Sequence, residues 1–119
     1  MAIAALAGRT SASRANSAKR TEEPRNRVPR VVTLLKQASD PTRLQLLSVL
    51  ADGERHVGAL CDDLGLGQPA VSHHLALLRH GGLVAPRRQG KNTIYALTET
   101  GEALAAVVDA LMASRAVRR

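Results

Sequence analysis

The sequence predicts a mainly α-helical fold, with about five helices and a two-stranded β-hairpin before the last of them. Aliphatic residues recur at i, i+3, i+4 and i+7 along much of the chain, change to a spacing of two after Gly81 and Gly82, and then return to helical spacing. Phe and Trp are absent and Tyr95 is the only aromatic residue, so the core must be aliphatic. A small aliphatic core in a chain of 119 residues favours a helical fold whose core is completed by a partner subunit.

The first helix is expected to begin near Pro29, because proline is tolerated in the first turn of a helix. Residues 1–28 then form a disordered basic arm, and residues 29–116 form a single folded domain. This helix carries an apolar stripe made of Val31, Val32, Leu34, Leu35 and Ala38.

The second helix is predicted to follow Asp40 and to end at Gly53. Asp40 is a good N-cap, and Pro41 fits the first helical position, where its missing N–H costs nothing. The apolar face of this helix is expected at Leu44, Leu47 and Val49 or Leu50.

Two short helices follow, joined by a Gly-Leu-Gly turn at residues 65–67. The second of them, "QPAVSHHLALLRH", ends at Gly81 and Gly82. Two short helices with a tight turn between them are the helix-turn-helix arrangement. The first of the pair carries an apolar stripe of Val57, Leu60, Cys61 and Leu64.

The hairpin is predicted from "LVAPRR" and "TIYAL", which flank the turn sequence "QGKN". Pro86 indicates that the first of these strands is an edge strand. Thr98 is the expected N-cap of the last helix. In this order the elements make a winged helix-turn-helix. The last helix has no partner helix in the sequence, so its apolar stripe is expected to form a dimer face with Leu104, Val107, Val108 and Leu111.

Positive charge is concentrated at the N-terminus. Residues 1–30 hold seven Lys and Arg against two Glu, whereas residues 31–119 hold ten basic against eight acidic residues. A basic arm on a nearly neutral body indicates a polyanionic partner. The arm has no apolar face that could insert into a membrane. A solvated tail that binds nothing and an organelle transit peptide are the alternatives for this segment.

The adjacent His73 and His74 raise the question of a metal or catalytic site. Neighbours on a helix point about 100° apart, so they do not share a ligand pocket, and the i, i+4 spacing of helical zinc ligands is absent. His56 and Cys61 would offer two ligands where four are usual. Cys61 is the only cysteine, which excludes an internal disulfide and suits a reducing compartment. We therefore expect that the protein is not an enzyme and that it binds neither a metal ion nor a cofactor.

The side of the 68–80 helix that lies opposite Val71, Leu75 and Leu78 is polar. Gln pairs bidentately with adenine, and Ser, His and Arg reach bases or phosphates. We predict that this face reads double-stranded DNA through Gln68, Ser72, His73 and Arg79. The wing is expected to contact the DNA backbone through Arg87, Arg88, Lys91 and Asn92, and the arm through Arg20, Arg25 and Arg27.

"SDPTR" at residues 39–43, "QPAVSHHL" at 68–75, and "GLV" followed by a basic turn and "IYAL" together resemble the ArsR/SmtB family of bacterial winged-helix repressors. The resemblance covers about residues 29–112. It implies that Gln68, Ser72 and His73 contact DNA together with Pro69, because proline is common in the family at that position, and that His74 is mainly a packing residue.

The same resemblance implies a homodimer that binds an operator palindrome in the bacterial cytoplasm, in association with the nucleoid, and releases it when a small inducer binds. The dimer would be held by the first and last helices, through Val31, Leu34, Leu35 and the stripe that contains Leu104 and Val108.

The metal sites of the family are not matched. Members that sense arsenic, cadmium or lead carry "ELCVCDL", where this chain has "ERHVGAL" with His56 and Gly58 at the thiolate positions. Members that sense zinc, cobalt or nickel use Asp, His and Glu ligands on the last helix, which has no histidine here, and Asp109 alone is not a site. Gly67 replaces the usual serine N-cap of the 68–80 helix, which costs only about a few tenths of a kcal/mol. The inducer stays unidentified.

Two functions remain. The first is a sequence-specific transcriptional repressor. The second is a winged-helix interaction module or a general DNA-architectural protein whose basic arm supplies most of the affinity. The ratio of the affinities for operator and random DNA distinguishes them, because only the repressor discriminates between sequences.

Overall fold

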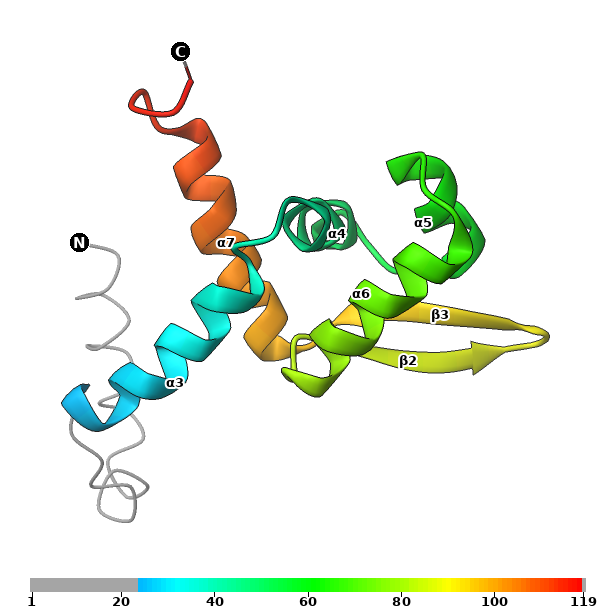
Figure 1. Ribbon diagram of the computed structural model, residues 1–119, viewed down its shortest axis with the longest axis horizontal. Helices are drawn as coiled ribbons and strands as arrows, with labels where there is room; N and C mark the ends of the chain where they lie inside the picture. The colour runs from blue at the N-terminus through cyan, green and yellow to red at the C-terminus, as the bar shows by residue number, and fades with distance from the viewer. Residues whose placement is uncertain (1–23, 119) are drawn as a thin grey trace. The chain divides into compact units, whose positions relative to one another are not determined.

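The computed structural model describes residues 24–118. The chain divides into two units, residues 1–30 and residues 31–119, and the boundary falls within the first described helix. Figure 1 shows the helices and strands along the described chain. In order, they are α3 (Pro24–Gln37), α4 (Pro41–Ala51), β1 (Arg55–His56), α5 (Val57–Leu64), α6 (Gln68–His80), β2 (Val84–Gln89), β3 (Asn92–Leu97) and α7 (Glu99–Ala113).

The helix α3 begins at Pro24, five residues before the expected start near Pro29. Pro24 takes the first helical position, which suits a residue without an N–H group, and Pro29 lies inside the helix. Either proline can start a helix, so the sequence alone does not choose between them. Arg25 and Arg27 of the predicted arm are therefore exposed residues of α3, whereas Arg20 lies outside the described residues.

The helix α4 begins as predicted. Asp40 is its N-cap, with its Oδ2 accepting a hydrogen bond of 3.0 Å from the backbone N–H of Arg43, and Pro41 takes the first position. The expected apolar face was partly wrong, because Leu46 is fully buried and Leu44 only half-buried. The reason is that α4 contacts α5, α6, α7 and β3, so it buries a wider face than one stripe.

The helices α5 and α6 confirm the predicted helix-turn-helix pair. Gly65 ends α5 in the left-handed conformation, at φ 67°, which glycine adopts without steric cost. Two residues then lead into α6. Both helices pack through aliphatic side chains that are fully buried, namely Leu60 of α5 and Val71, Leu75 and Leu78 of α6.

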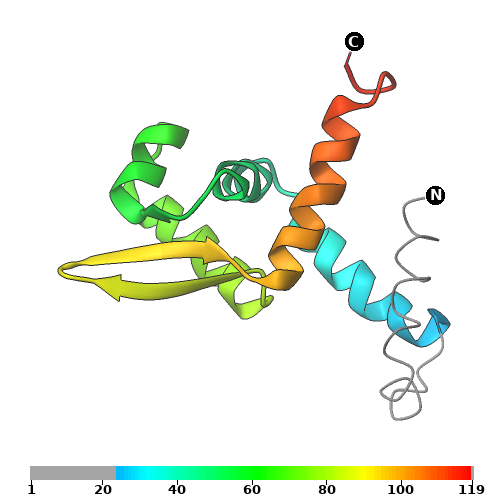
Figure 2. The same ribbon diagram turned by 180° about the vertical axis from the view of Figure 1, so that it is seen from behind.

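The predicted hairpin is confirmed as β2 and β3. A third strand, β1, was not predicted, and it extends the hairpin to a three-stranded antiparallel sheet in the order β1-β3-β2. In β1, Arg55 pairs with Tyr95 and His56 with Ile94. A strand of two residues is too short to show an alternating pattern, so the sequence did not predict it. Pro86 lies on the edge strand β2, as predicted. Figures 1 and 2 show β2 and β3 extending beyond the helices, with their turn furthest from α7.

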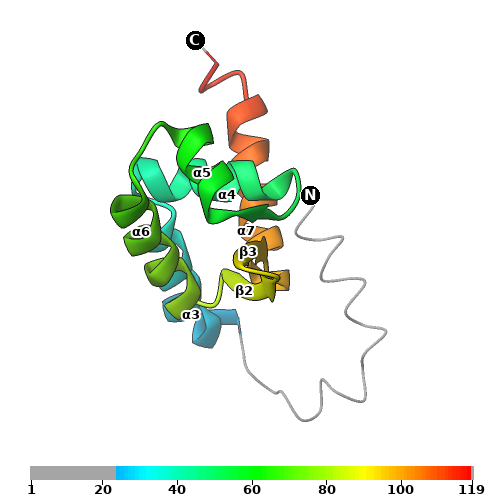
Figure 3. The same cartoon turned by 90° about the vertical axis from the view of Figure 1, so that its right-hand side faces the viewer.

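The helix α7 starts at its predicted N-cap, Thr98, whose hydroxyl accepts a hydrogen bond from the N–H of Gly101 at 3.0 Å. It packs against α4 and β3. Figure 3, which looks along the hairpin, shows α6 beside it. The aliphatic core lies between α4, α5, α6, α7 and the base of the hairpin, and it consists of Leu46, Leu47, Leu50, Leu60, Val71, Leu75, Leu78, Leu83, Val84 and Leu104.

Candidate nucleic-acid interface

The outward face of α6 is a continuous polar surface. Burial of Val71, Leu75 and Leu78 on one side of the helix leaves the predicted contact residues exposed on the other. A helix presented in this way fits the major groove of B-DNA, where each base pair shows a distinct pattern of donors and acceptors. The exposed set contains every residue predicted for this helix, namely Gln68, Pro69, Ser72, His73 and Arg79.

The N-terminal end of α6 has the character of an anion-binding end. Its N-cap, Gly67, has no side chain to accept hydrogen bonds from the first turn, and among residues 68–71 there is no acidic residue. The first intrahelical bond runs from the N–H of Val71 to the carbonyl of Gly67, at 3.2 Å. The N–H of Ala70 therefore remains available to a phosphate oxygen, and the helix dipole favours negative charge there.

The turn of the hairpin carries the predicted wing residues. Gln89 pairs with Asn92 across a two-residue turn of Gly90 and Lys91, in which Gly90 has φ 62°. Arg88 and Lys91 are exposed, as are Arg87 and Asn92. Two cations beside a tight turn are suited to phosphates that flank a groove.

Arg87 differs from the other wing residues because its guanidinium is ion-paired with the carboxylate of Glu54, which precedes β1. Both side chains are about half exposed. To bind a phosphate through this guanidinium, Arg87 must share it with Glu54 or leave it. Sequence reasoning missed this pair, since the two residues are 33 positions apart and no motif connects them.

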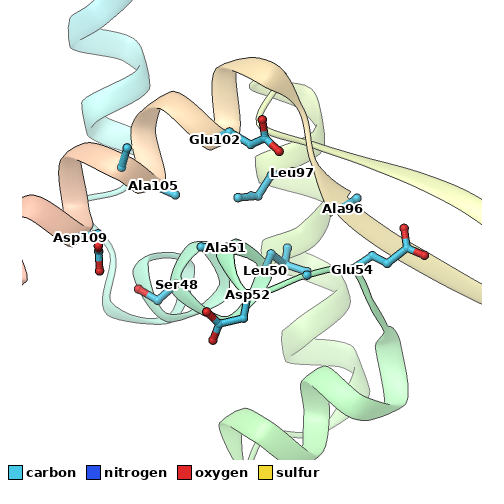
Figure 4. A pocket seen from close by; sticks show the side chains of 12 residues that line it. Ser48, Leu50, Ala51, Asp52, Glu54, Ala96, Leu97, Glu102, Ala105 and Asp109 are labelled. Carbon is cyan, nitrogen blue, oxygen red and sulfur yellow. The ribbon is translucent and has the colours of Figure 1, made fainter.

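An acidic cleft of about 530 Å³ lies between α4, α7 and β3 (Figure 4). Four of its lining residues are the carboxylates Asp52, Glu54, Glu102 and Asp109, and none of the described residues that line it is basic. The lining includes no residue of α6 or of the turn between β2 and β3. This face repels a polyanion, so it favours the α6 and wing surface as the side that meets DNA.

Within residues 24–118, no group of three or more His, Cys, Asp and Glu side chains is arranged to hold a metal ion. Nδ1 of His56 accepts a hydrogen bond from the backbone N–H of Ala59 at 3.2 Å, so this histidine caps α5. Cys61 is a free, half-buried thiol that packs against the core. No helix in the described part of the chain is long and apolar enough to cross a lipid bilayer.

The residues predicted for a dimer face differ in their exposure. Leu104 and Val108 are 6% and 8% exposed and belong to the core of the chain itself. Leu34 is half-buried. The others remain about half exposed on α3 and α7, together with two residues that the sequence reasoning did not choose: the exposed set is Val31, Val32, Leu35, Val107, Leu111 and Met112.

Taken together, the tight α5–α6 pair, the exposed polar face of α6 and the basic hairpin define a winged helix-turn-helix DNA-binding domain. The family model for bacterial regulatory proteins of the arsR family matches residues 40–85. The biofilm growth-associated repressor of Xylella fastidiosa is 44% identical over 78 residues, which are 66% of this chain and 68% of that protein. This chain belongs to the ArsR family of bacterial transcriptional regulators.

Two further relatives extend the comparison. The transcriptional activator HlyU of Vibrio cholerae is 44% identical over 71 residues, which are 60% of this chain and 66% of that protein. The solution structure of a homodimeric winged helix-turn-helix DNA-binding domain from Mycobacterium bovis, described as a possible ArsR-family regulator, matches with a TM-score of 0.69 at 30% identity. That match covers 82% of this chain and 94% of the other.

Proposed function

We propose that this protein is a homodimeric repressor that binds an operator palindrome with α6 in the major groove and is released by a small inducer. One observation carries the proposal. The exposed face of α6 carries the polar residues Gln68, Ser72, His73 and Arg79. At its N-terminal end, no side chain of the described residues caps the first turn of the helix. These groups can read base edges and hold a phosphate at the same time.

The contacts divide by their chemistry. Gln68, Ser72 and His73 supply hydrogen bonds to base edges, which distinguish one sequence from another. Arg88, Lys91 and Asn92 at the wing contact phosphates, which position the domain without reading sequence. The predicted arm residues Arg20, Arg25 and Arg27 add affinity of the same unspecific kind.

The dimer is supported by the exposed apolar residues of α3 and α7 and by the homodimeric relative from Mycobacterium bovis. A twofold dimer presents two copies of α6, so its target is a palindrome with half-sites about 34 Å apart, or a multiple of that spacing. Such a regulator works in the bacterial cytoplasm, in association with the nucleoid.

The experiment is a binding titration with two DNA duplexes. The first is selected from a pool of random sequences by the full-length protein, and the second is an unselected random duplex of equal length. At about 0.15 M salt we expect the selected duplex to bind at least about a thousandfold more tightly. Sedimentation should give a dimer, and a reporter gene behind the selected sequence should be expressed less when the protein is present.

A DNA-architectural protein is the second candidate, favoured by the seven basic residues within residues 1–30. It predicts nearly equal affinity for the two duplexes, with a strong dependence on salt for both.

A further inference from the structure

His74 faces inward from α6, toward Arg43 of α4 and Asp40, the N-cap of that helix. Its side chain is 19% exposed. Its Nδ1 lies 3.3 Å from an Nη atom of Arg43 and 3.7 Å from Oδ2 of Asp40. The neighbouring His73 is exposed on the polar face, and the two rings meet edge to face with centroids 5.3 Å apart.

The same guanidinium of Arg43 also holds the end of α3. Its Nε donates a hydrogen bond of 2.8 Å to the carbonyl oxygen of Gln37, the last residue of α3. The side chain of Gln37 in turn lies under Gly81, where an added Cβ would come within 3.3 Å of its Cγ. The α3–α4 junction therefore contacts α6 at two places, at His74 in the middle and at Gly81 just beyond the end.

The chemistry of the contact fixes the form of the ring. A guanidinium only donates hydrogen bonds, so Nδ1 of His74 accepts, and in the neutral ring the proton lies on Nε2. At 3.7 Å, Asp40 is too distant for a hydrogen bond to the same nitrogen. Asp40 instead keeps a negative charge beside Arg43. The hydrogen bond from the Arg43 backbone N–H, and the charge of its guanidinium, hold the pKa of this carboxyl below its ordinary value.

We infer that His74 is a positioning residue, which through Arg43 fixes the rotation of α6 about its own axis. The inference rests on the proposed role of α6 as the reading helix. The other inward residues, Val71, Leu75 and Leu78, make apolar contacts, which are less directional than a hydrogen bond. A hydrogen bond is directional, so it restrains the orientation of His74. Because His73 is the next residue of the same helix, its orientation toward the DNA major groove is restrained as well.

This link also joins the reading helix to α3, which carries part of the exposed apolar surface proposed as the dimer face. A displacement at the end of α3 would reach α6 through the Arg43 guanidinium, since one planar group holds both Gln37 and His74. The two adjacent histidines therefore do different work: His73 meets the DNA, and His74 sets the angle at which it does so.

The test compares His74→Asn with His74→Leu. The Asn side chain can place an acceptor oxygen close to the position of Nδ1, whereas Leu fills a similar volume without an acceptor. We expect the ratio of the affinities for the selected and random duplexes to fall about tenfold in His74→Leu and to stay within about threefold of wild type in His74→Asn. Affinity for the random duplex should stay within about twofold, because the phosphate contacts remain. If His74 only packs, Leu will keep the wild-type ratio and Asn will be the worse variant, which would overturn the inference.

Arg43→Lys supplies the second half of the test. An ammonium group cannot hold Gln37 and His74 in one planar fork, so we expect a loss similar to that of His74→Leu. The double variant should lose no more than either single variant, because both break one link. Additive losses would show that the two residues act separately, and that would also overturn the inference.

A measurement without DNA separates this inference from the proposed function. Long-range proton–nitrogen NMR spectra of the full-length protein should show Nδ1 of His74 without a proton. The amide resonances of residues 68–80 should shift in His74→Leu and remain near wild type in His74→Asn. A proton on Nδ1, or unchanged amide resonances in His74→Leu, would show that the hydrogen bond between Arg43 and His74 does not position α6, even if the protein is a repressor. If wild type binds both duplexes equally, the proposed function fails and the spectra alone decide whether the link exists.

Discussion

Gly101 in the first turn of α7 lies directly against the backbone of Leu83 at the base of the wing. A Cβ added to Gly101 would be 2.0 Å from the Leu83 carbonyl oxygen, which already accepts a hydrogen bond of 3.0 Å from the N–H of Thr98. The Thr98 hydroxyl caps Gly101 and also donates to the carbonyl of Gly82 at 2.6 Å. The wing and the last helix are thus joined by close backbone contact.

Gly101→Ala should destabilise the domain by about 2 kcal/mol or more, because the backbone of Leu83 must move to admit the methyl group. The intrinsic preference of helices for Ala over Gly, about 0.5–1 kcal/mol, is too small to offset this. Denaturant unfolding measures the change. Gly58→Ala is the matched control, since its Cβ would meet only the His56 side chain at 3.4 Å. We expect it to be neutral or slightly stabilising, and an equal loss in both variants would contradict the explanation.

The reading face should be separable from the fold. Gln68→Ala and His73→Ala should each lower the affinity for the selected duplex by about 1–3 kcal/mol and leave the melting temperature nearly unchanged. Val71→Ala and Leu75→Ala, at positions that are 0% exposed, should instead destabilise the domain by roughly 1–5 kcal/mol. Should both polar variants bind as wild type does, α6 is not the reading helix.

The ion pair between Glu54 and Arg87 predicts that a loss of negative charge strengthens DNA binding. Glu54→Gln frees the guanidinium, and if it then contacts one phosphate, the slope of log K against log salt should steepen by about 0.9. Asp109→Asn removes an equal charge from the same cleft without touching the wing, so its slope should not change. No steepening in Glu54→Gln, or the same steepening in both variants, would show that the pair does not restrain Arg87.

Deletion of residues 1–23 tests the basic arm while keeping α3 intact, and it removes Arg9, Arg14, Lys19 and Arg20. If these residues bind phosphates, the salt slope should flatten by about 0.9 for each phosphate that the shortened protein no longer neutralises, to the same extent for both duplexes. An unchanged slope would mean that the arm is a tail without a role in DNA binding.

Cys61→Ser should keep the affinity for the selected duplex within about twofold, and neither peroxide nor micromolar zinc should release the wild-type protein. Cys61 is half-buried and the chain has no second cysteine to form a disulfide with it. His56 already uses Nδ1 to cap α5, which leaves at most two ligands at this place. Release by zinc that is abolished in His56→Ala or Cys61→Ser would instead establish a metal sensor.

Local signals predicted several helix ends correctly, although not the start of α3. Asp40 and Thr98 cap α4 and α7, and Gly65 ends α5, because caps depend on residues next to each other in sequence. Periodicity did less well where an element is covered on several sides. It favoured Leu44 over Leu46 in α4, and it placed the whole stripe of α7 at a dimer face although Leu104 and Val108 lie in the core of the chain.

The candidate site was predictable in part for the same reason. The exposed residues of α6 follow from the helical period once the buried stripe is known. The contacts of Arg43 with His74 and of Glu54 with Arg87 join residues 31 and 33 positions apart, and polar pairs of this kind leave no periodic trace. The strand β1 was not predicted either, because its two residues are defined as a strand only by their pairing with β3.

The three-stranded sheet contains a natural optical reporter. Tyr95, the only aromatic residue of the chain, lies on the central strand, between Arg55 of β1 and Pro86 of β2. With no Trp or Phe elsewhere, intrinsic ultraviolet fluorescence comes from this one ring. A change in its intensity during a titration therefore describes the sheet at the base of the wing alone, and the emission needs no label to be interpreted.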